Sequence, residues 1–231
     1  RHGAYDFIEK PFKEERLLRM AERAISSANL SQENSELKSM VTDSVTPELI
    51  GNSAVMRGIR QSIEKIALTS SRVLVSGPSG SGKELAARCI HSKSTRKDER
   101  FVVANCARLA SERVDAELFG SESLQSHRRV VGLFEQAHQG TLYFDEICDL
   151  PVDTQGKIVR AVNEQRFRRV GGSTEVVVDV RVISASSRDL AAEMSAGRLR
   201  EDLYYQRGVV PLTMPPLEAR KEDIQLHAQQ L

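Results

Sequence analysis

The chain of 231 residues carries a formal net charge of +1, from 33 lysines and arginines against 32 aspartates and glutamates. This balance does not favour a protein that binds a polyanion through its overall charge. Its three cysteines show no C-x-x-C spacing and its five histidines are scattered, so free thiols are expected and a zinc site is not. No apolar run approaches membrane-spanning length and the N-terminus has no signal-peptide core, which predicts a soluble, cytoplasmic protein without membrane contact.

Residues 1–46 contain two segments that differ from the rest of the chain. Residues 1–12 alternate apolar and polar side chains and end in Lys10-Pro11-Phe12, which is typical of the last strand of another domain. Residues 13–46 are charged, with apolar side chains at helical spacing between Leu17 and Met40. This spacing predicts a helical linker that is able to pair with a second copy, although an interruption at residues 26–35 weakens the case for a strict coiled coil.

From residue 47 onward, helical and strand patterns alternate, beginning with a predicted helix at residues 54–68. Strands are predicted at residues 73–76, 101–104, 141–145 and 180–185. Helices are predicted between them at residues 83–91, 111–119, 131–137 and 153–165. This alternation is typical of an α/β fold with a parallel sheet flanked by helices. The turn Gly171-Gly172-Ser173 predicts a hairpin that extends to residue 179.

The loop after the first of these strands has the pattern G-x-x-x-x-G-K, which is typical of a phosphate-binding loop (P-loop). Its glycines allow consecutive backbone N–H groups to point at one anion, and the lysine adds positive charge near the β- and γ-phosphates. A glycine turn without a ligand is the alternative, and the strand–loop–helix context favours the P-loop. Glu84 stands where the pattern usually has a serine or threonine that contacts magnesium. The predicted phosphate-binding residues are Gly77, Pro78, Ser79, Gly80, Ser81, Gly82, Lys83 and Glu84.

A second motif, Asp145-Glu146, ends the apolar strand predicted at residues 141–145. An aspartate at such a strand end holds Mg²⁺ in P-loop proteins, and a glutamate beside it can activate the attacking water as a general base. Adjacent side chains of an extended segment point in opposite directions, so the two acids suit two separate tasks. The alternative is an acidic pair that only ends a strand in solvent.

These motifs resemble the central AAA+ domain of the NtrC family, which comprises sigma-54-dependent transcription activators of bacteria. The resemblance covers most of residues 50–231 and rests on the segments Gly77–Glu84, Asn105-Cys106-Ala107, Glu117–Gly120, Phe134–Ala137, Gly140–Glu146 and Arg200–Tyr205. It implies an AAA+ P-loop NTPase fold, and in this family Glu84 is the usual residue after the lysine. Residues 3–12 are similar to the end of a receiver domain, with Phe7 at the aromatic switch position and Lys10 at the phosphoryl-contacting lysine.

The resemblance implies three segments in this chain. Residues 1–12 would be the C-terminal end of a receiver domain, and residues 13–46 the helical linker. Residues 47–231 would be the AAA+ ATP-binding α/β subdomain, with the helical lid and the DNA-binding domain outside the chain.

The resemblance also implies ATP and Mg²⁺ as ligands, and it assigns roles to further residues. Asp145 would hold Mg²⁺, and Glu146 would be the water-activating base. Asn105 matches the asparagine that restrains this glutamate. Ile50 and Gly51 lie where the adenine packs in the family.

Arg200 matches one of two arginine fingers that reach the γ-phosphate of a neighbouring subunit. The implied partners are further copies of the chain, as a dimer or a ring, and a cognate sensor kinase. DNA would be bound through a C-terminal domain that the chain does not include.

The chain departs from the family pattern at three places. The sigma-54-contacting loop of the family reads Gly-Ala-Phe-Thr-Gly-Ala, whereas residues 121–131 are shorter and contain neither glycine nor an aromatic side chain. A moving loop needs backbone freedom and contact area, so this segment argues against productive contact with sigma-54. Gln206 replaces the second arginine finger, and Ser186-Ser187 replaces a Thr-Asn pair in the sensing segment.

We therefore expect the ATP-binding central domain of a two-component transcriptional regulator, with the sigma-54 loop lost and hydrolysis weak or absent. The alternative is an active ATPase that remodels a transcription partner, since Glu146, Asn105 and Arg200 are all present. A small-molecule P-loop kinase is a third possibility, which the Glu117–Gly120 and Arg200–Tyr205 segments disfavour.

Overall fold

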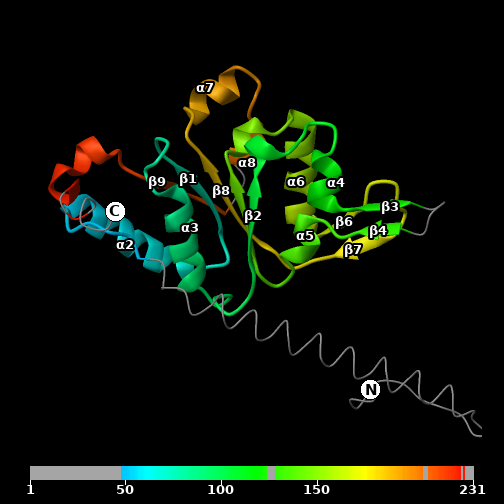
Figure 1. Cartoon of the computed structure of the whole chain (residues 1–231), viewed down its shortest axis with the longest axis horizontal. Helices are drawn as coiled ribbons and strands as arrows, with labels where there is room; N and C mark the ends of the chain where they lie inside the picture. Colours follow the sequence, from blue (N-terminus) through cyan, green and yellow to red (C-terminus); the bar gives the residue numbers. More distant parts are fainter. Residues whose placement is uncertain (1–47, 124–127, 205–207, 225, 227–231) are drawn as a thin grey trace, which may run out of the picture. The chain divides into compact units, whose positions relative to one another are not determined.

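The structure is a computed structural model that describes residues 48–123, 128–204, 208–224 and 226, so the predictions for residues 1–46 lie outside it. Its centre is a sheet with the strand order β2–β5–β8–β1–β9, in which every neighbouring pair is parallel (Figure 1). The strands are β1 (Arg72–Ser76), β2 (Phe101–Asn105), β5 (Thr141–Asp145), β8 (Arg181–Ser186) and β9 (Val209–Thr213). The four predicted strands and the parallel sheet are confirmed, and β9 is an additional edge strand.

Helices flank the sheet, as the sequence predicts. They are α2 (Ala54–Ala67), α3 (Lys83–Ser92), α4 (Val114–Phe119), α5 (Leu133–Gln136), α6 (Val152–Glu164), α7 (Leu190–Ser195) and α8 (Glu201–Tyr204). Short 3₁₀ segments lie at Cys106–Arg108, Ile147–Asp149 and Leu217–Asp223. The predicted helices correspond to α2 through α6, and α4 and α5 are shorter than predicted.

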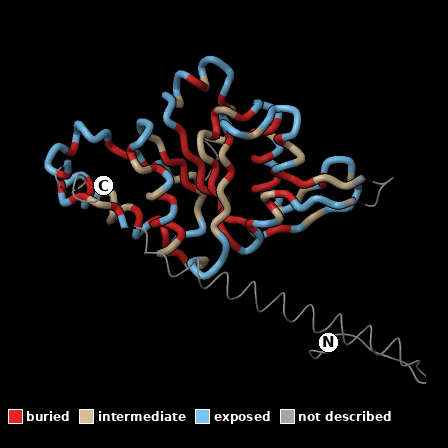
Figure 2. The backbone as a smooth tube through the Cα atoms, in the orientation of Figure 1, coloured by how far each residue is buried: buried red, intermediate tan, exposed pale blue. Residues whose placement is uncertain are grey.

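The two faces of the sheet bury different side chains because neighbouring side chains of a strand point to opposite faces. Tyr143 packs among residues of α2 and α3 on one face. Leu142 and Phe144, its neighbours in β5, pack among residues of α4, α5 and α6 on the other face. Figure 2 shows the buried backbone concentrated along the central strands and the inner sides of the helices. The sheet therefore separates two hydrophobic cores.

Two antiparallel hairpins lie on the side of the fold that carries α4, α5 and α6 (Figure 1). In one, β3 (Ser121–Ser123) pairs with β4 (Arg128–Val130), and in the other, β6 (Arg166–Arg168) pairs with β7 (Glu175–Val177). The second hairpin confirms the prediction for the glycine turn at residues 171–173. The backbone joins the two hairpins, since the Glu122 N–H donates to the Val170 carbonyl at 2.9 Å.

Four charged side chains, Glu122, Arg129, Glu135 and Arg169, lie where the hairpins meet α5, and we call them the hairpin-base cluster. Arg169 donates from Nε and Nη2 to the two oxygens of Glu135 at 2.8 and 2.6 Å. Arg129 donates to Glu135 at 2.9 Å, and Glu122 lies 3.5 Å from Arg169. Burial raises the pKa of Glu135, but the hydrogen bonds from Arg169 and Arg129 outweigh it and hold the pKa below its ordinary value.

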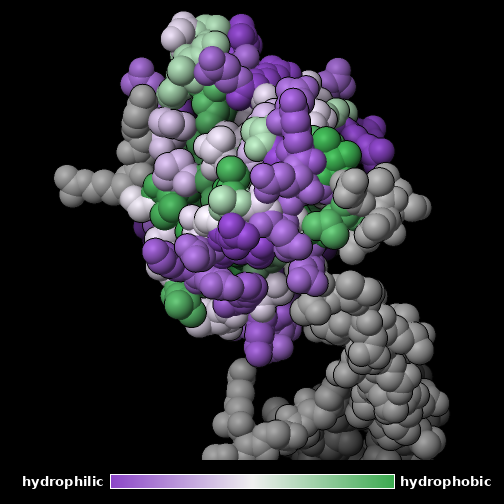
Figure 3. Space-filling view, turned by 90° about the vertical axis from the view of Figure 1, so that its left-hand side faces the viewer, coloured by the Kyte–Doolittle hydropathy of each residue, from purple (hydrophilic) through white to green (hydrophobic). Residues whose placement is uncertain are grey.

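The surface is mostly polar on the side where α2 lies. Figure 3 shows hydrophilic residues over most of this face, with hydrophobic residues in separate areas between them. Within the described part of the chain, no helix has both the length and the apolar composition that a bilayer crossing requires.

Candidate nucleotide-binding site

The predicted P-loop lies at the carboxyl end of β1 and leads directly into α3. Two of its glycines are required by the backbone. A Cβ atom on Gly77 would lie 2.6 Å from the carbonyl oxygen of Met214, and Gly82 precedes α3 with a left-handed φ of +94°. The loop thus has the tight turn and the helix N-terminus that an anion site needs.

Lys83 is the first residue of α3, and its side chain turns back over the loop rather than into solvent. It is 7% exposed, and its ammonium group donates to the carbonyl oxygens of Gly77 at 3.0 Å and Pro78 at 3.2 Å. It also lies 3.3 Å from Oε1 of Glu146. The structure therefore brings the P-loop lysine and the acidic motif together, although Lys83 and Glu146 are 63 positions apart in the sequence.

Asp145 and Glu146 follow different paths at the end of β5. Oδ1 of Asp145 accepts from the Tyr143 hydroxyl at 3.1 Å, and this residue remains part of the strand. Glu146 leaves the strand in a left-handed conformation with φ +56°, and its Oε2 accepts from the Ser187 N–H at 2.8 Å. The two carboxylates thus have separate hydrogen-bond partners.

Asn105 ends β2 directly opposite Asp145 in the sheet register. It therefore lies at the same edge of the sheet as the acidic pair. In the described residues Glu146 binds Lys83 and Ser187, and no hydrogen bond joins it to Asn105. The predicted restraining contact is not present in this conformation.

Ile50 and Gly51 precede α2, and their segment packs against the 3₁₀ segment Leu217–Asp223. The Asp223 carboxylate accepts hydrogen bonds from the N–H groups of Asn52 and Ser53. Arg220 donates to the carbonyl oxygen of Ser81 in the P-loop. Our sequence-based site omitted Arg220 and Asp223, because the run Glu-Ala-Arg-Lys-Glu-Asp has the composition of a solvated surface segment.

Arg200 lies just before α8, and it makes no described contact with Lys83 or Glu146. Its guanidinium donates to both carboxylate oxygens of Asp202 at 2.9 and 2.8 Å, and this hydrogen-bonded pair raises the pKa of Arg200. This placement is compatible with a finger that acts on another subunit. The second finger position, Gln206, lies outside the described residues.

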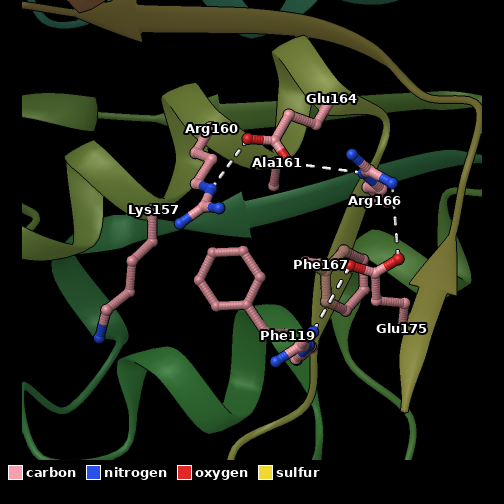
Figure 4. A pocket seen from close by; sticks show the side chains of 9 residues that line it. Phe119, Lys157, Arg160, Ala161, Glu164, Arg166, Phe167 and Glu175 are labelled. Carbon is pink, nitrogen blue, oxygen red and sulfur yellow. Dashed lines mark hydrogen bonds and ion pairs between the residues drawn. The ribbon is translucent and has the colours of Figure 1, made fainter. Parts of the chain in front are cut away.

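A pocket of about 290 Å³ lies between α6 and the β6–β7 hairpin (Figure 4). Phe119 and Phe167 contribute aromatic rings to its wall. Glu175 at its rim pairs with Arg166 at 3.6 Å and Arg168 at 3.7 Å. No P-loop residue lines this pocket, so it is separate from the candidate nucleotide site.

The residues of the candidate site fit a magnesium nucleotide. A Cβ atom on Gly77 would fill part of the cradle, and the buried Ser81 hydroxyl has no hydrogen-bond partner in the described structure. Mg²⁺ prefers oxygen ligands and is usually held by one or two carboxylates together with phosphates. Asp145 supplies such a carboxylate, and the described residues contain no cluster of three or more metal-ligating side chains that would hold an ion alone.

The parallel sheet, the P-loop after β1 and the acidic pair after β5 define the class as an AAA+ P-loop NTPase domain. Residues 49–213 match the family described as the sigma-54 interaction domain. The chain belongs to the NtrC family of sigma-54-dependent response regulators.

Relatives of known description support this assignment. The chain is 47% identical over 224 residues to the nitrogen assimilation regulatory protein NtrX of Azorhizobium caulinodans, covering 97% of this chain and 49% of that protein. It is 42% identical over 232 residues to the response regulator protein PilR of Pseudomonas aeruginosa, covering 99% and 50%. The chain spans about half the length of the curated relatives it matches.

Solved structures show the same likeness. Crystal structures of NtrX from Brucella abortus in complex with ADP and with ATP match with a TM-score of 0.74 each. Their identities to this chain are 47% and 46%, and the match covers 98% of this chain and 51% of theirs.

Proposed function

We propose that residues 47–231 bind ATP with Mg²⁺ and act as the regulatory nucleotide-binding domain of a two-component transcriptional regulator. The observation that carries this proposal is the buried Lys83 ammonium, which lies inside the P-loop turn and contacts Glu146 from the neighbouring motif. The B. abortus NtrX structures, described as complexes with ADP and ATP, support it by similarity. Residues 1–12 and 13–46 would be the end of a receiver domain and a helical linker.

Each residue of the site has a chemical task in this proposal. The P-loop amides and the Lys83 ammonium bind the phosphates, and Asp145 holds Mg²⁺, which neutralises phosphate charge. Glu146 accepts a proton from the attacking water, and Asn105 restrains Glu146 before the domain is engaged. The Ile50-Gly51 segment packs on the adenine. Arg200 of one subunit reaches the γ-phosphate of the next.

We further propose that hydrolysis is weak or absent. An arginine finger contributes about 10³- to 10⁵-fold to kcat in phosphoryl transfer, and Gln206 replaces the second one. The Ser186 hydroxyl at the end of β8 already has partners, since it donates to the Cys148 sulfur at 3.4 Å and accepts from the Arg188 N–H at 3.1 Å. The second candidate function, an active ATPase that remodels a transcription partner, is favoured by the retained Glu146.

Turnover measurements on the full-length protein separate the two candidates. We expect ATP binding without steady Mg-ATP hydrolysis at any protein concentration, because the site lacks the second finger arginine. The Glu146→Gln variant should then show the same background rate as the wild type. Steady hydrolysis well above background that Glu146→Gln abolishes would contradict this proposal and favour the second candidate.

The sigma-54 interaction domain of this chain lacks the sequence of the contact loop. The β3–β4 hairpin flanks residues 124–127, which lie outside the described residues, and residues 121–131 contain no glycine and no aromatic side chain. We propose that the Gly-Ala-Phe-Thr-Gly-Ala function of this loop is lost. The protein would then regulate transcription through DNA contacts made by another domain.

A pull-down with purified sigma-54 tests this loss. We expect the full-length protein to retain no more sigma-54 with a non-hydrolysable ATP analogue than without nucleotide. A variant that carries a Gly-Ala-Phe-Thr-Gly-Ala loop in place of residues 123–130 is the positive comparison. Nucleotide-dependent retention by the unmodified protein would contradict the proposal.

The remaining partners follow from the class of regulator. We propose that the protein assembles with further copies of itself, as a dimer or a ring, and receives a phosphoryl group from a sensor kinase. A cytoplasmic location is supported by Cys89, Cys106 and Cys148, which are buried and form no disulfide bond in the described structure.

A further inference from the structure

We propose that Arg220 and Asp223 are positioning residues that hold the P-loop and the Leu49–Ser53 segment in the geometry that binds ATP. The two side chains belong to the 3₁₀ segment Leu217–Asp223, and we call them the Arg220–Asp223 clamp. The inference rests on the proposed ATP binding and adds two residues to it.

Asp223 fixes the segment before α2. Its carboxylate is fully buried and accepts three hydrogen bonds: from the Asn52 N–H at 2.6 Å, the Ser53 N–H at 2.9 Å and the Ser53 hydroxyl at 2.6 Å. The Ser53 hydroxyl bond and the two N–H bonds lower the pKa of Asp223, with a smaller contribution from the charge of Arg220. The carboxylate is therefore ionised at neutral pH and bound firmly to this turn.

Gly51 allows the carboxylate to come this close. Its φ is +129°, and a Cβ atom built on it would lie 2.6 Å from Oδ2 of Asp223. Any larger residue would both strain the backbone and displace the carboxylate. Gly51, for which the family resemblance implies a place at the adenine, therefore also has a packing role against Asp223.

Arg220 fixes the P-loop from the buried side. Its Nη2 donates to the Ser81 carbonyl oxygen at 3.0 Å, and its Nη1 lies 3.4 Å from the sulfur of Met56 in α2. The residue is 5% exposed, and no carboxylate lies within ion-pair distance of it in the described structure. Burial of a guanidinium without a carboxylate at ion-pair distance is costly, and the hydrogen bond to the Ser81 carbonyl offsets part of that cost.

The planarity of the peptide group gives Arg220 a direct effect on phosphate binding. In a trans peptide the C=O and the next N–H point in opposite directions. Because Arg220 holds the Ser81 carbonyl on the buried side, the Gly82 N–H of the same peptide group must point away from the guanidinium. The guanidinium also places a positive charge directly behind the loop that binds the triphosphate.

Arg220 and Asp223 are three residues apart on one short segment, yet they bind residues that are 28 positions apart, Ser81 and Ser53. The Arg220–Asp223 clamp therefore fixes the distance between the adenine segment and the phosphate loop. Arg220 should affect the affinity for any triphosphate, including one without adenosine. Asp223 should affect the affinity only for ligands that carry the adenosine part.

The test compares Arg220→Met, Arg220→Lys and Asp223→Ala with the wild type, using titrations with ATP and with inorganic tripolyphosphate. Arg220→Met should raise the Kd for both ligands at least tenfold, and Arg220→Lys should recover part of the loss because it keeps the charge. Asp223→Ala should raise the Kd for ATP about tenfold and leave the Kd for tripolyphosphate within twofold. A purely structural role would not produce this difference between ligands.

Arg181 supplies a matched control. Like Arg220, Arg181 is buried and donates to backbone carbonyls, in this case those of Ile66 and Ala67. The Nε atom of each arginine has no hydrogen-bond partner in the described structure. Arg181 lies at the start of β8, at the opposite edge of the sheet from the P-loop. Arg181→Met should therefore lower the melting temperature without changing the Kd for ATP of the folded protein.

The outcomes separate the clamp from ATP binding itself. A wild type that binds no ATP would refute the proposed function. If the wild type binds ATP and both Arg220→Met and Arg220→Lys bind it as tightly as the wild type, the clamp is refuted and the proposed ATP binding stands. If Arg220→Met does not fold, Arg220→Lys decides: an affinity at least threefold weaker supports the clamp, and an unchanged affinity refutes it.

Discussion

Replacement of Lys83 by alanine is expected to weaken ATP binding about 100-fold or more. The lysine ammonium is buried within the P-loop turn, where it can donate to two phosphate oxygens, and hydrogen bonds to charged groups contribute about 1.5–3 kcal/mol each. A loss of about 2.7 kcal/mol corresponds to the stated factor. Titration of labelled ATP onto the wild type and Lys83→Ala measures it.

Lys93→Ala is the control for Lys83→Ala. Lys93 directly follows the same helix, but it is exposed and pairs with Glu64 at 2.8 Å. Exposed ion pairs contribute little, so the Kd for ATP should remain within about twofold. If Lys83→Ala binds ATP as tightly as the wild type, the triphosphate is not held by this loop.

Replacement of Phe134 by alanine is expected to lower the free energy of unfolding by about 3–5 kcal/mol. Phe134 is 1% exposed, and its ring centroid lies 5.3 Å from that of Phe119, 5.7 Å from that of Phe167 and 6.0 Å from that of Phe144. Removal of the ring leaves a cavity among three other aromatic side chains. Equilibrium urea denaturation measures the change.

Two comparisons make the Phe134 prediction specific. Val177→Ala removes an apolar side chain that is 73% exposed, and it should change the free energy of unfolding by no more than about 0.5 kcal/mol. Phe134 belongs to the core opposite α3, so the Kd for ATP of folded Phe134→Ala should equal that of the wild type. A loss of stability below about 1 kcal/mol would show that the ring is not part of a packed core.

The sheet and the P-loop could be predicted because their signals are local. The Gly77–Lys83 pattern sits between a β-branched strand and a helix, and three of the predicted strands contain apolar runs, at residues 73–75, 101–104 and 142–144. The edge strand β9 escaped prediction because Pro211 lies in its middle, and proline argues against a central strand. At an edge that pairs only with β1, proline is tolerated.

Contacts between distant segments could not be predicted from local patterns. Arg220 and Asp223 lie in a charged run, and only the folded chain brings them against Ser81 and Ser53. Glu146 likewise bonds to the Ser187 N–H only because β8 lies next to β5 in the sheet. The sequence indicates which chemical groups are available, whereas strand order determines which of them meet.

The hairpin-base cluster couples the motions of the two hairpins. Glu135 belongs to α5, and it binds Arg129 of one hairpin and Arg169 beside the other through the same carboxylate. Neither hairpin can tilt without stretching a bond that also restrains its neighbour. A displacement of β3–β4 is therefore passed to β6–β7 through the single carboxylate of Glu135, which couples the positions of the two hairpins.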